Sequence, residues 1–159
     1  MGVVTYEFEV TSPVAPTRLF KAFVLEGVKV YPKAAPHAIK SVELEGDGKP
    51  GSIVKINFVE GLPFQYMKHM IGGHDENNLS YSYSLIEGGP LGDKLEKISY
   101  ENQFVAAASG GSVCKSSIKF YTVGDYVITE DEIKALVQRS EVVYKAIEAF
   151  LLANPDACN

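Results

Sequence analysis

The chain has few of the residues on which several functional classes depend. It contains two cysteines, no tryptophan and three histidines. Two cysteines cannot form the disulfide network of a small secreted domain, so Cys114 and Cys158 are expected to be free thiols. The histidines His37, His69 and His74 have no metal-ligand spacing with one another or with the cysteines. We therefore expect neither a bound metal nor another cofactor.

Basic charge and long apolar segments are also scarce. The 15 lysines and arginines are outnumbered by 20 acidic residues, which gives a net charge of −5. Nucleic-acid binding needs a basic surface, so a nucleic-acid partner is disfavoured. No apolar run approaches the roughly 18 residues that span a bilayer, and the N-terminus lacks the apolar stretch of a signal peptide. No membrane association is expected; a cytoplasmic location fits best, and a nuclear one is compatible with the same features.

The remaining composition is that of a folded domain. The 159 residues are 46% hydrophobic, which is enough for one core, so we expect a single domain over residues 1–159. Apolar and polar residues alternate from Val4 to Val10, which predicts a strand with one buried face. Two short helices are expected next, over residues 18–25 and then up to Tyr31, ending before Pro32. Further strands are predicted over residues 39–45, 53–59, 64–71, 79–87, 94–107 and 112–123, with a polar turn at 72–78.

The last third of the chain predicts one long helix. Thr129 and Glu132 have the spacing of a capping box, and apolar residues then recur at helical intervals until Asn154-Pro155. A helix of about 24 residues is about 36 Å long. Its apolar stripe must lie against a broad apolar surface, for which the concave face of a curved sheet is the natural partner. One helix cannot fill such a face, so an internal gap is expected.

The most conspicuous motif is the glycine-rich segment Gly46, Asp47, Gly48, Lys49, Pro50 and Gly51. A phosphate-binding loop has the order G-x-x-x-x-G-K-[ST] and opens a helix. Here the lysine precedes the last glycine, and a β-branched strand follows. We interpret the segment as a turn in which glycines provide positive φ angles, with anion binding as the alternative.

Several segments together resemble the plant pathogenesis-related class 10 family, of the birch-pollen-allergen type. The resemblance covers nearly the whole chain. The matching segments are Met1–Val3, Thr5–Tyr6, Leu19–Leu25, Pro32–Lys33, Ala35–Pro36, Glu45–Gly48, Ala146–Glu148 and Asn154–Pro155. A long family signature also matches at Gly88, Leu91, Glu96, Ser99, Gly110–Ser112, Lys115 and Phe120, whereas Ser109 departs from it.

This resemblance implies an α+β helix-grip fold. In that fold a seven-stranded antiparallel sheet wraps round the long C-terminal helix, with two short helices after the first strand, and encloses a cavity. The family's usual ligands are flavonoids, cytokinins, sterols and fatty acids, and many members are stress-induced cytosolic proteins or allergens. We therefore expect a monomeric carrier or buffer of small amphipathic molecules with a role in plant defence.

Strand alternation combined with the expected cavity predicts a set of ligand-binding residues. They are Tyr6, Phe8, Phe23, Val30, Ile39, Phe58, Tyr66, His69, Tyr81, Tyr83, Tyr100, Cys114, Arg139 and Val143. Tyrosine suits such a wall because it joins a large apolar ring to one hydroxyl, although aromatic stripes are also ordinary core. Tyr66 and His69 are three residues apart, so in a regular strand they would point to opposite faces. Both can point into the cavity only if a bulge lies between them. Arg139 has three alternative roles: guarding the entrance, pairing with an anionic ligand, or lying on a solvated helix face.

Two enzymatic alternatives are disfavoured. Ribonuclease activity has been attributed to relatives, and Glu96 and Glu148 match proposed catalytic positions. However, Val54 and Phe150 replace the family's lysine and tyrosine, and phosphodiester cleavage needs an acid, a base and a cation. Relatives that condense amines with aldehydes use a lysine on the strand at residues 79–87, which has none here. We therefore expect no enzymatic activity.

A regulatory alternative comes from a short turn. Residues Glu60–Pro63 resemble the Ser-Gly-Leu-Pro gate of related abscisic-acid receptors, although Glu60 replaces the serine. Those receptors inhibit protein phosphatases when the hormone is bound. Glycine–proline turns are common between strands, so the match of this tetrapeptide is weak evidence. Hormone-gated binding of a protein phosphatase is nevertheless the alternative function.

Overall fold

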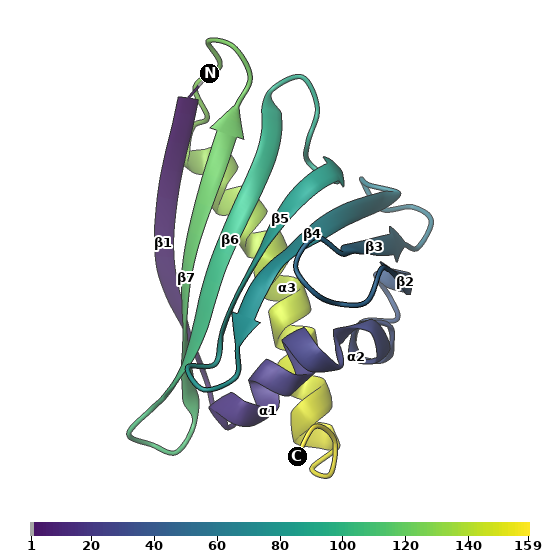
Figure 1. The fold of residues 1–159 in the computed structure, drawn as a ribbon, viewed down its shortest axis with the longest axis vertical. Coiled ribbons are helices and arrows are strands. Elements are labelled where there is room, and N and C mark those ends of the chain that lie inside the picture. Colours follow the sequence, from purple (N-terminus) through teal and green to yellow (C-terminus); the bar gives the residue numbers. More distant parts are fainter. Residues whose placement is uncertain (1) are drawn as a thin grey trace.

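The computed structural model describes residues 2–159, so Met1, with which the family resemblance begins, lies outside the described residues. It shows the predicted α+β helix-grip arrangement (Figure 1). The strands are β1 (Gly2–Ser12), β2 (Ile39–Glu45), β3 (Ile53–Phe58), β4 (Tyr66–Asp75), β5 (Ser80–Gly88), β6 (Leu95–Ala106) and β7 (Ser112–Thr122). The helices are α1 (Pro16–Phe20), the π-helical turn η1 (Lys21–Leu25), α2 (Gly27–Ala34) and α3 (Glu130–Ala153).

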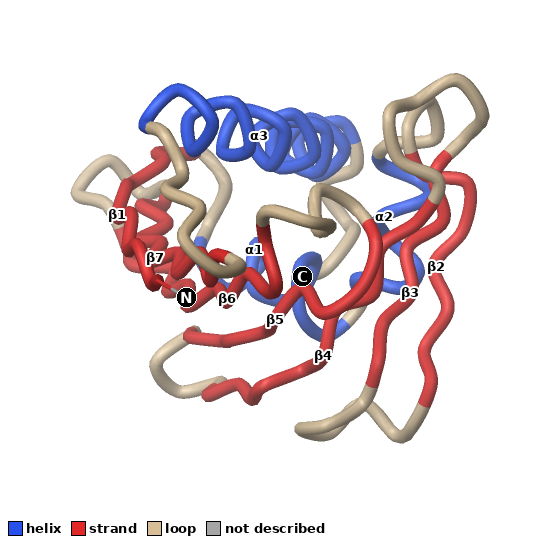
Figure 2. Tube along the Cα trace, turned by 90° about the horizontal axis from the view of Figure 1, so that it is seen from above, coloured by secondary structure: helices blue, strands red, loops and turns tan. Residues whose placement is uncertain are grey.

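The described strands form one antiparallel sheet in the order β1-β7-β6-β5-β4-β3-β2. From β2 to β7, each strand pairs with the next strand along the chain. The first strand, β1, pairs with the last strand, β7, along its whole length. Figure 2 shows the sheet curling beneath α3, so that α3 lies across its concave side. This curvature leaves the central strands farther from the helix than the two ends of the sheet.

Helix α3 has the predicted start and end. The Thr129 hydroxyl accepts a hydrogen bond from the Glu132 amide at 3.2 Å, and the Glu132 carboxylate accepts from the Thr129 amide, which completes the capping box. The helix ends before Asn154-Pro155, as proline cannot continue it. No helix within residues 2–159 has the length and apolar content needed to cross a membrane.

Two of the predicted boundaries are wrong. Strand β4 does not end at Ile71 but continues to Asp75, because Gly72 forms a β-bulge there: the register with β5 shifts between Ile71 and Gly73. A Cβ atom at Gly72 would lie 2.5 Å from the Ser82 hydroxyl and 3.1 Å from the Ser82 carbonyl oxygen, so a larger residue would require Ser82 to move. Helix α2 likewise runs through Pro32 to Ala34, although the proline has no N–H and so removes one helical hydrogen bond.

Two apolar clusters hold α3 at its ends. Ile133 and Val137 pack with Ile98 and Phe120 of the sheet under the first half of the helix. Toward the C-terminus, Ile147 belongs to a second cluster that contains the buried side chains of α1. The turns of α3 between these clusters face the space that forms the candidate site.

Candidate ligand-binding cavity

A cavity of about 370 Å³ lies between the middle of α3 and the concave face of the sheet. Its walls come from all the strands of the sheet, β2 contributing Ile39, from Phe23 and Tyr31 of the short helices, and from side chains of α3 between Leu136 and Tyr144. The turn between β3 and β4, which contributes Leu62, Pro63 and Phe64, closes the remaining side. The volume is within the range of small-molecule sites, and most of the lining is apolar.

Most of the predicted site residues line this cavity. They are Phe8, Phe23, Ile39, Phe58, His69, Tyr81, Tyr83, Tyr100, Cys114, Arg139 and Val143. Strand alternation places those of the sheet on the concave face, whereas Phe23 comes from η1 and Arg139 and Val143 come from α3. The sheet and α3 therefore bring together residues that are far apart in the sequence.

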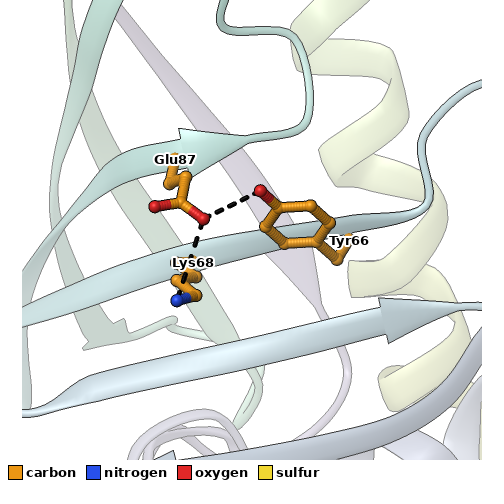
Figure 3. Close-up of polar contacts among 3 residues, drawn as sticks. All are labelled: Tyr66, Lys68 and Glu87. Atoms are coloured by element: carbon orange, nitrogen blue, oxygen red, sulfur yellow. Dashed lines mark hydrogen bonds and ion pairs between the residues drawn. The ribbon is translucent and has the colours of Figure 1, made fainter.

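The prediction for Tyr66 is wrong. Its hydroxyl donates a hydrogen bond to Glu87 Oε2 at 2.8 Å, and Lys68 Nζ lies 3.7 Å from the same oxygen (Figure 3). The Lys55 ammonium lies 5.2 Å from the centre of the Tyr66 ring. These charged neighbours place Tyr66 on the outer face of the sheet, where its ring faces the Lys55 ammonium.

The physical reason is the location of the bulge. The register does shift beside His69, but the extra residue is Ile86 on β5, because Lys68 pairs with Glu87 and His69 pairs with Leu85. Strand β4 therefore keeps its strict alternation from residue 66 to residue 71. Met67 consequently lines the cavity together with His69.

Tyr6 and Val30 lie inside the protein but outside the cavity wall. Tyr6 packs against the cluster under the first half of α3, its ring centre 5.8 Å from that of Phe8. Val30, 5% exposed, belongs to the cluster around α1. Strand alternation predicts which side chains point toward the inside of the protein, but it does not distinguish those that pack in the core from those that line the cavity.

Several cavity residues were missed by the sequence analysis. They are Val10, Tyr31, Ala38, Ile56, Leu62, Pro63, Phe64, Met67, Leu85, Pro90, Asn102, Phe104, Ser116, Ile118, Leu136, Ser140, Glu141, Val142 and Tyr144. Some could have been found by extending the alternation two residues beyond Tyr100 and Cys114. The rest depend on where the turns and α3 pass over the sheet.

Aromatic rings form one continuous wall. The Tyr83 ring centre lies 4.5 Å from that of Tyr100 and 4.6 Å from that of His69. Tyr81 stacks beside Tyr83 at 6.0 Å. Burial raises the pKa of Tyr81, Tyr83 and Tyr100, so all three phenols stay protonated. None of these hydroxyls has a hydrogen-bond partner within residues 2–159, so each can donate to a ligand.

At the α1 end of the cavity a second aromatic group limits its length. The Phe23 ring stacks on Tyr144 at 5.5 Å and lies 5.7 Å from Phe104. The Tyr144 hydroxyl is buried without a hydrogen-bond partner in the described part of the chain. These three rings make the α1 end of the site a packed aromatic wall.

A small polar group interrupts the apolar floor. The Ser116 hydroxyl donates to Asn102 Oδ1 at 2.6 Å, and the two residues are 8% and 9% exposed. Cys114 Sγ lies 3.7 Å from the same hydroxyl, and burial raises the pKa of the Cys114 thiol. The amide nitrogen of Asn102 donates to no acceptor among the described residues. It is therefore available to a cavity ligand.

The glycine-rich segment 46–51 is the predicted turn and lies outside the cavity lining. Asp47 Oδ1 accepts hydrogen bonds from the Lys49 amide at 3.0 Å and from the Ser52 hydroxyl at 3.2 Å. The Gly48 amide donates to the Ser52 hydroxyl at 3.1 Å. The hydrogen bond from Lys49 holds the pKa of Asp47 below its usual range. An ionised carboxylate thus takes the donors that a phosphate would need, which argues against anion binding.

Protonation of His69 is expected to oppose folding. Burial lowers the pKa of His69 from 6.5 to about 4, because the charged ring loses hydration. Between these pH values the unfolded chain binds more protons, so the free energy of unfolding falls as pH decreases through this window. The full shift corresponds to about 3 kcal/mol, and contact of the half-buried ring with cavity water reduces this value.

The measurement is urea unfolding of the wild type and His69→Gln between about pH 4 and 7. Carboxylates such as Asp47 titrate in both proteins, so the difference between them isolates the imidazole. We expect this difference to be constant near neutral pH and to shift in favour of the variant as pH falls below 6.5. A difference that does not change with pH would contradict the prediction.

The fold and the cavity define a helix-grip protein with an internal cavity. The family model described as pathogenesis-related protein Bet v 1 family matches residues 1–154. The chain is 53% identical to major allergen Pru av 1 of Prunus avium and 51% identical to major pollen allergen Bet v 1-B of Betula pendula. Both alignments span 160 positions and cover 100% of each chain. The protein belongs to the Bet v 1 family, which confirms the predicted resemblance.

Solved structures show the same fold. The crystal structure of Ara h 8.0201 matches with a TM-score of 0.85 and 41% identity, over 96% of this chain and 100% of that one. Norcoclaurine synthase from Thalictrum flavum, in complex with dopamine and hydroxybenzaldehyde, matches with a TM-score of 0.71 and 22% identity. That alignment covers 96% of this chain and 88% of the synthase. At this identity the likeness is one of fold alone, and it shows that the fold also serves enzymes.

Proposed function

We propose that the protein is a carrier or buffer of small amphipathic plant metabolites or hormones, such as flavonoids or cytokinins, and acts as a monomer in the cytoplasm. The observation that carries the proposal is the cavity of about 370 Å³, whose apolar wall holds unpaired tyrosine hydroxyls. An apolar site with a few polar groups is typical of small-molecule binding. Micromolar affinity, about −8 kcal/mol, is expected for a ligand enclosed in this way.

The arrangement of the cavity argues against catalysis. Its lining contains no lysine among the described residues, so it lacks an amine of the kind used in amine–aldehyde condensation. The ribonuclease alternative fares no better. Strand β6, which carries Glu96 as its second residue, begins beside the N-terminal end of β1, whereas Glu148 lies near the C-terminal end of α3 at the opposite end of the molecule (Figure 1). The two carboxylates therefore cannot act on one phosphodiester.

Dye binding tests the proposed function. An environment-sensitive apolar dye should bind the wild type and be displaced by a flavonoid or cytokinin. Val143→Trp places an indole in the cavity from α3 and should weaken dye binding by at least about tenfold, roughly 1.4 kcal/mol. The measurement is a fluorescence titration, and Leu152→Trp, at an exposed position on the same helix, is the matched control.

Two results would count against a carrier. One is the absence of dye binding and of any ligand-induced rise in melting temperature. The other is equal binding by the wild type and Val143→Trp, which would place the dye outside the cavity. Incubation of the pure protein with a metabolite extract, followed by mass spectrometry of what stays bound, would identify the natural ligand.

Hormone-gated inhibition of a protein phosphatase is the second candidate function. It is favoured by the position of the turn at Glu60–Pro63, since Leu62 and Pro63 border the cavity and Leu62 is 40% exposed. A bound ligand would contact this turn directly. A phosphatase pull-down that depends on hormone would favour this candidate, and ligand binding without phosphatase capture would favour the carrier.

A further inference from the structure

Arg139 provides a positive charge at the edge of the cavity. It lies on α3 between the lining residues Leu136 and Val143, and its guanidinium carbon is 4.8 Å from the centre of the Phe64 ring. The ring belongs to the turn between β3 and β4, so this cation–π contact joins α3 to the opposite side of the mouth. Arg139 is an exposed residue, and this contact holds its guanidinium over the Phe64 ring.

No carboxylate neutralises this charge. In the described chain the ion pairs involve Lys68, Lys134 and Lys145, and none involves Arg139. Glu141 is the other ionised residue of the lining, and no ion pair joins its carboxylate to Arg139. The guanidinium is thus an unpaired cation that borders an apolar cavity.

The polar groups deeper in the cavity are mainly hydrogen-bond donors. The hydroxyls of Tyr81, Tyr83 and Tyr100 stay protonated and have no acceptor among the described residues. The carbonyl oxygen of Asn102 is already occupied by Ser116, which leaves its NH₂ group free. The tyrosine hydroxyls can donate or accept, whereas the Asn102 NH₂ group can only donate, so acceptor oxygens on a ligand would satisfy all of these groups.

We propose that the cavity prefers planar aromatic acids, whose carboxylate pairs with Arg139 at the mouth while the ring system stacks on the tyrosine wall. Guanidinium and carboxylate form two parallel charge-assisted hydrogen bonds, a geometry that lysine cannot reproduce. Acceptor oxygens on the ring system would meet the tyrosine hydroxyls or the Asn102 amide. This inference rests on the proposed function, because it specifies the ligand class of the same cavity.

Two dyes with the same ring system test the inference. Anilinonaphthalene sulfonate carries an anionic group that stands in for the carboxylate, and phenylnaphthylamine is its neutral counterpart. Arg139→Met should weaken binding of the sulfonate by about tenfold, while binding of the neutral dye changes by less than about twofold. For the wild type, the preference for the sulfonate should decrease as salt is raised from about 20 to 500 mM.

Two further variants serve as controls. Lys134→Gln removes a positive charge from an exposed position on the same helix and should leave both dyes unaffected. Arg139→Lys keeps the charge without the planar fork and should restore part of the affinity for the sulfonate. Circular dichroism confirms that each variant is folded.

The outcomes separate this inference from the proposed function. If Arg139→Met weakens both dyes equally, Arg139 acts by packing on Phe64 and the preference for acids is overturned. If neither dye responds to the substitution, it is overturned as well, while binding of the neutral dye still supports a carrier. If the wild type binds neither dye, the proposed function itself is contradicted.

Discussion

Replacing Ile147 with alanine is expected to lower the free energy of unfolding by about 4 kcal/mol. Ile147 lies on α3 and is 0% exposed, packed in the cluster that includes Leu19, Phe20 and Leu151. Truncation removes buried methyl groups and leaves a space that the surrounding side chains fill only in part. The effect should be near the upper end of the range because the middle of α3 spans the cavity and the helix depends on the clusters at its ends.

The measurement is urea unfolding followed by circular dichroism, since the chain has no tryptophan to report fluorescence. Leu152→Ala is the control: it makes a similar truncation on the same helix, but Leu152 is 53% exposed. A change of less than about 0.5 kcal/mol is expected there. Similar losses for both variants would show that Ile147 is not the buried anchor described above.

Replacing Arg18 with methionine is expected to cost about 2–3 kcal/mol, because Arg18 satisfies carbonyl groups beyond its own helix. Its Nη2 donates to the carbonyls of Leu151, Asn154 and Ala157 at 3.0, 3.0 and 2.9 Å. The last turn of α3 contains no basic residue, and its C-cap residue Asn154 leaves the helical conformation. The carbonyl groups at the end of α3 are therefore paired by a side chain from α1.

Urea unfolding of two further variants tests the geometry of this contact. Lys21→Met removes a neighbouring charge whose contact is with Asn159 at the exposed chain end, and should cost less than about 0.5 kcal/mol. Arg18→Lys should recover only part of the loss, since lysine lacks the second donor, Nε, which also bonds the Ala157 carbonyl at 3.2 Å. An equal loss for Lys21→Met and Arg18→Met would point to general charge, and would contradict the capping role.

Local sequence patterns predicted much of the fold, because each pattern reflects an element that is buried on one side and exposed on the other. Alternation located β1 and its inward face, and the Thr129–Glu132 capping box located the start of α3. The same reasoning failed at Gly72, where glycine suits a bulge as well as a turn. Its role is decided by Ser82 on the neighbouring strand, which is a long-range contact.

The cavity was harder to predict than the fold. Tyr6 and Phe8 share a face of β1, yet only Phe8 reaches the cavity, because the position of α3 over the sheet decides which inward residues are covered. Tyr66 and Met67 are neighbours on β4, and the choice between them was decided by which strand carries the extra residue. Periodicity predicts the direction in which each side chain points. Whether that side chain lines a cavity depends on which residues of other elements lie across from it.

If the protein carries a metabolite as proposed, the gap between the two apolar clusters that hold α3 couples the stability of the protein to the supply of that metabolite. The middle of α3 covers empty volume, so a guest supplies contacts that the polypeptide does not provide for itself. A guest present at a hundred times its dissociation constant adds about 2.7 kcal/mol to stability. Cells that make the ligand would then accumulate the more stable, ligand-bound protein. Cells that lack the ligand would contain the ligand-free protein, which is degraded more readily.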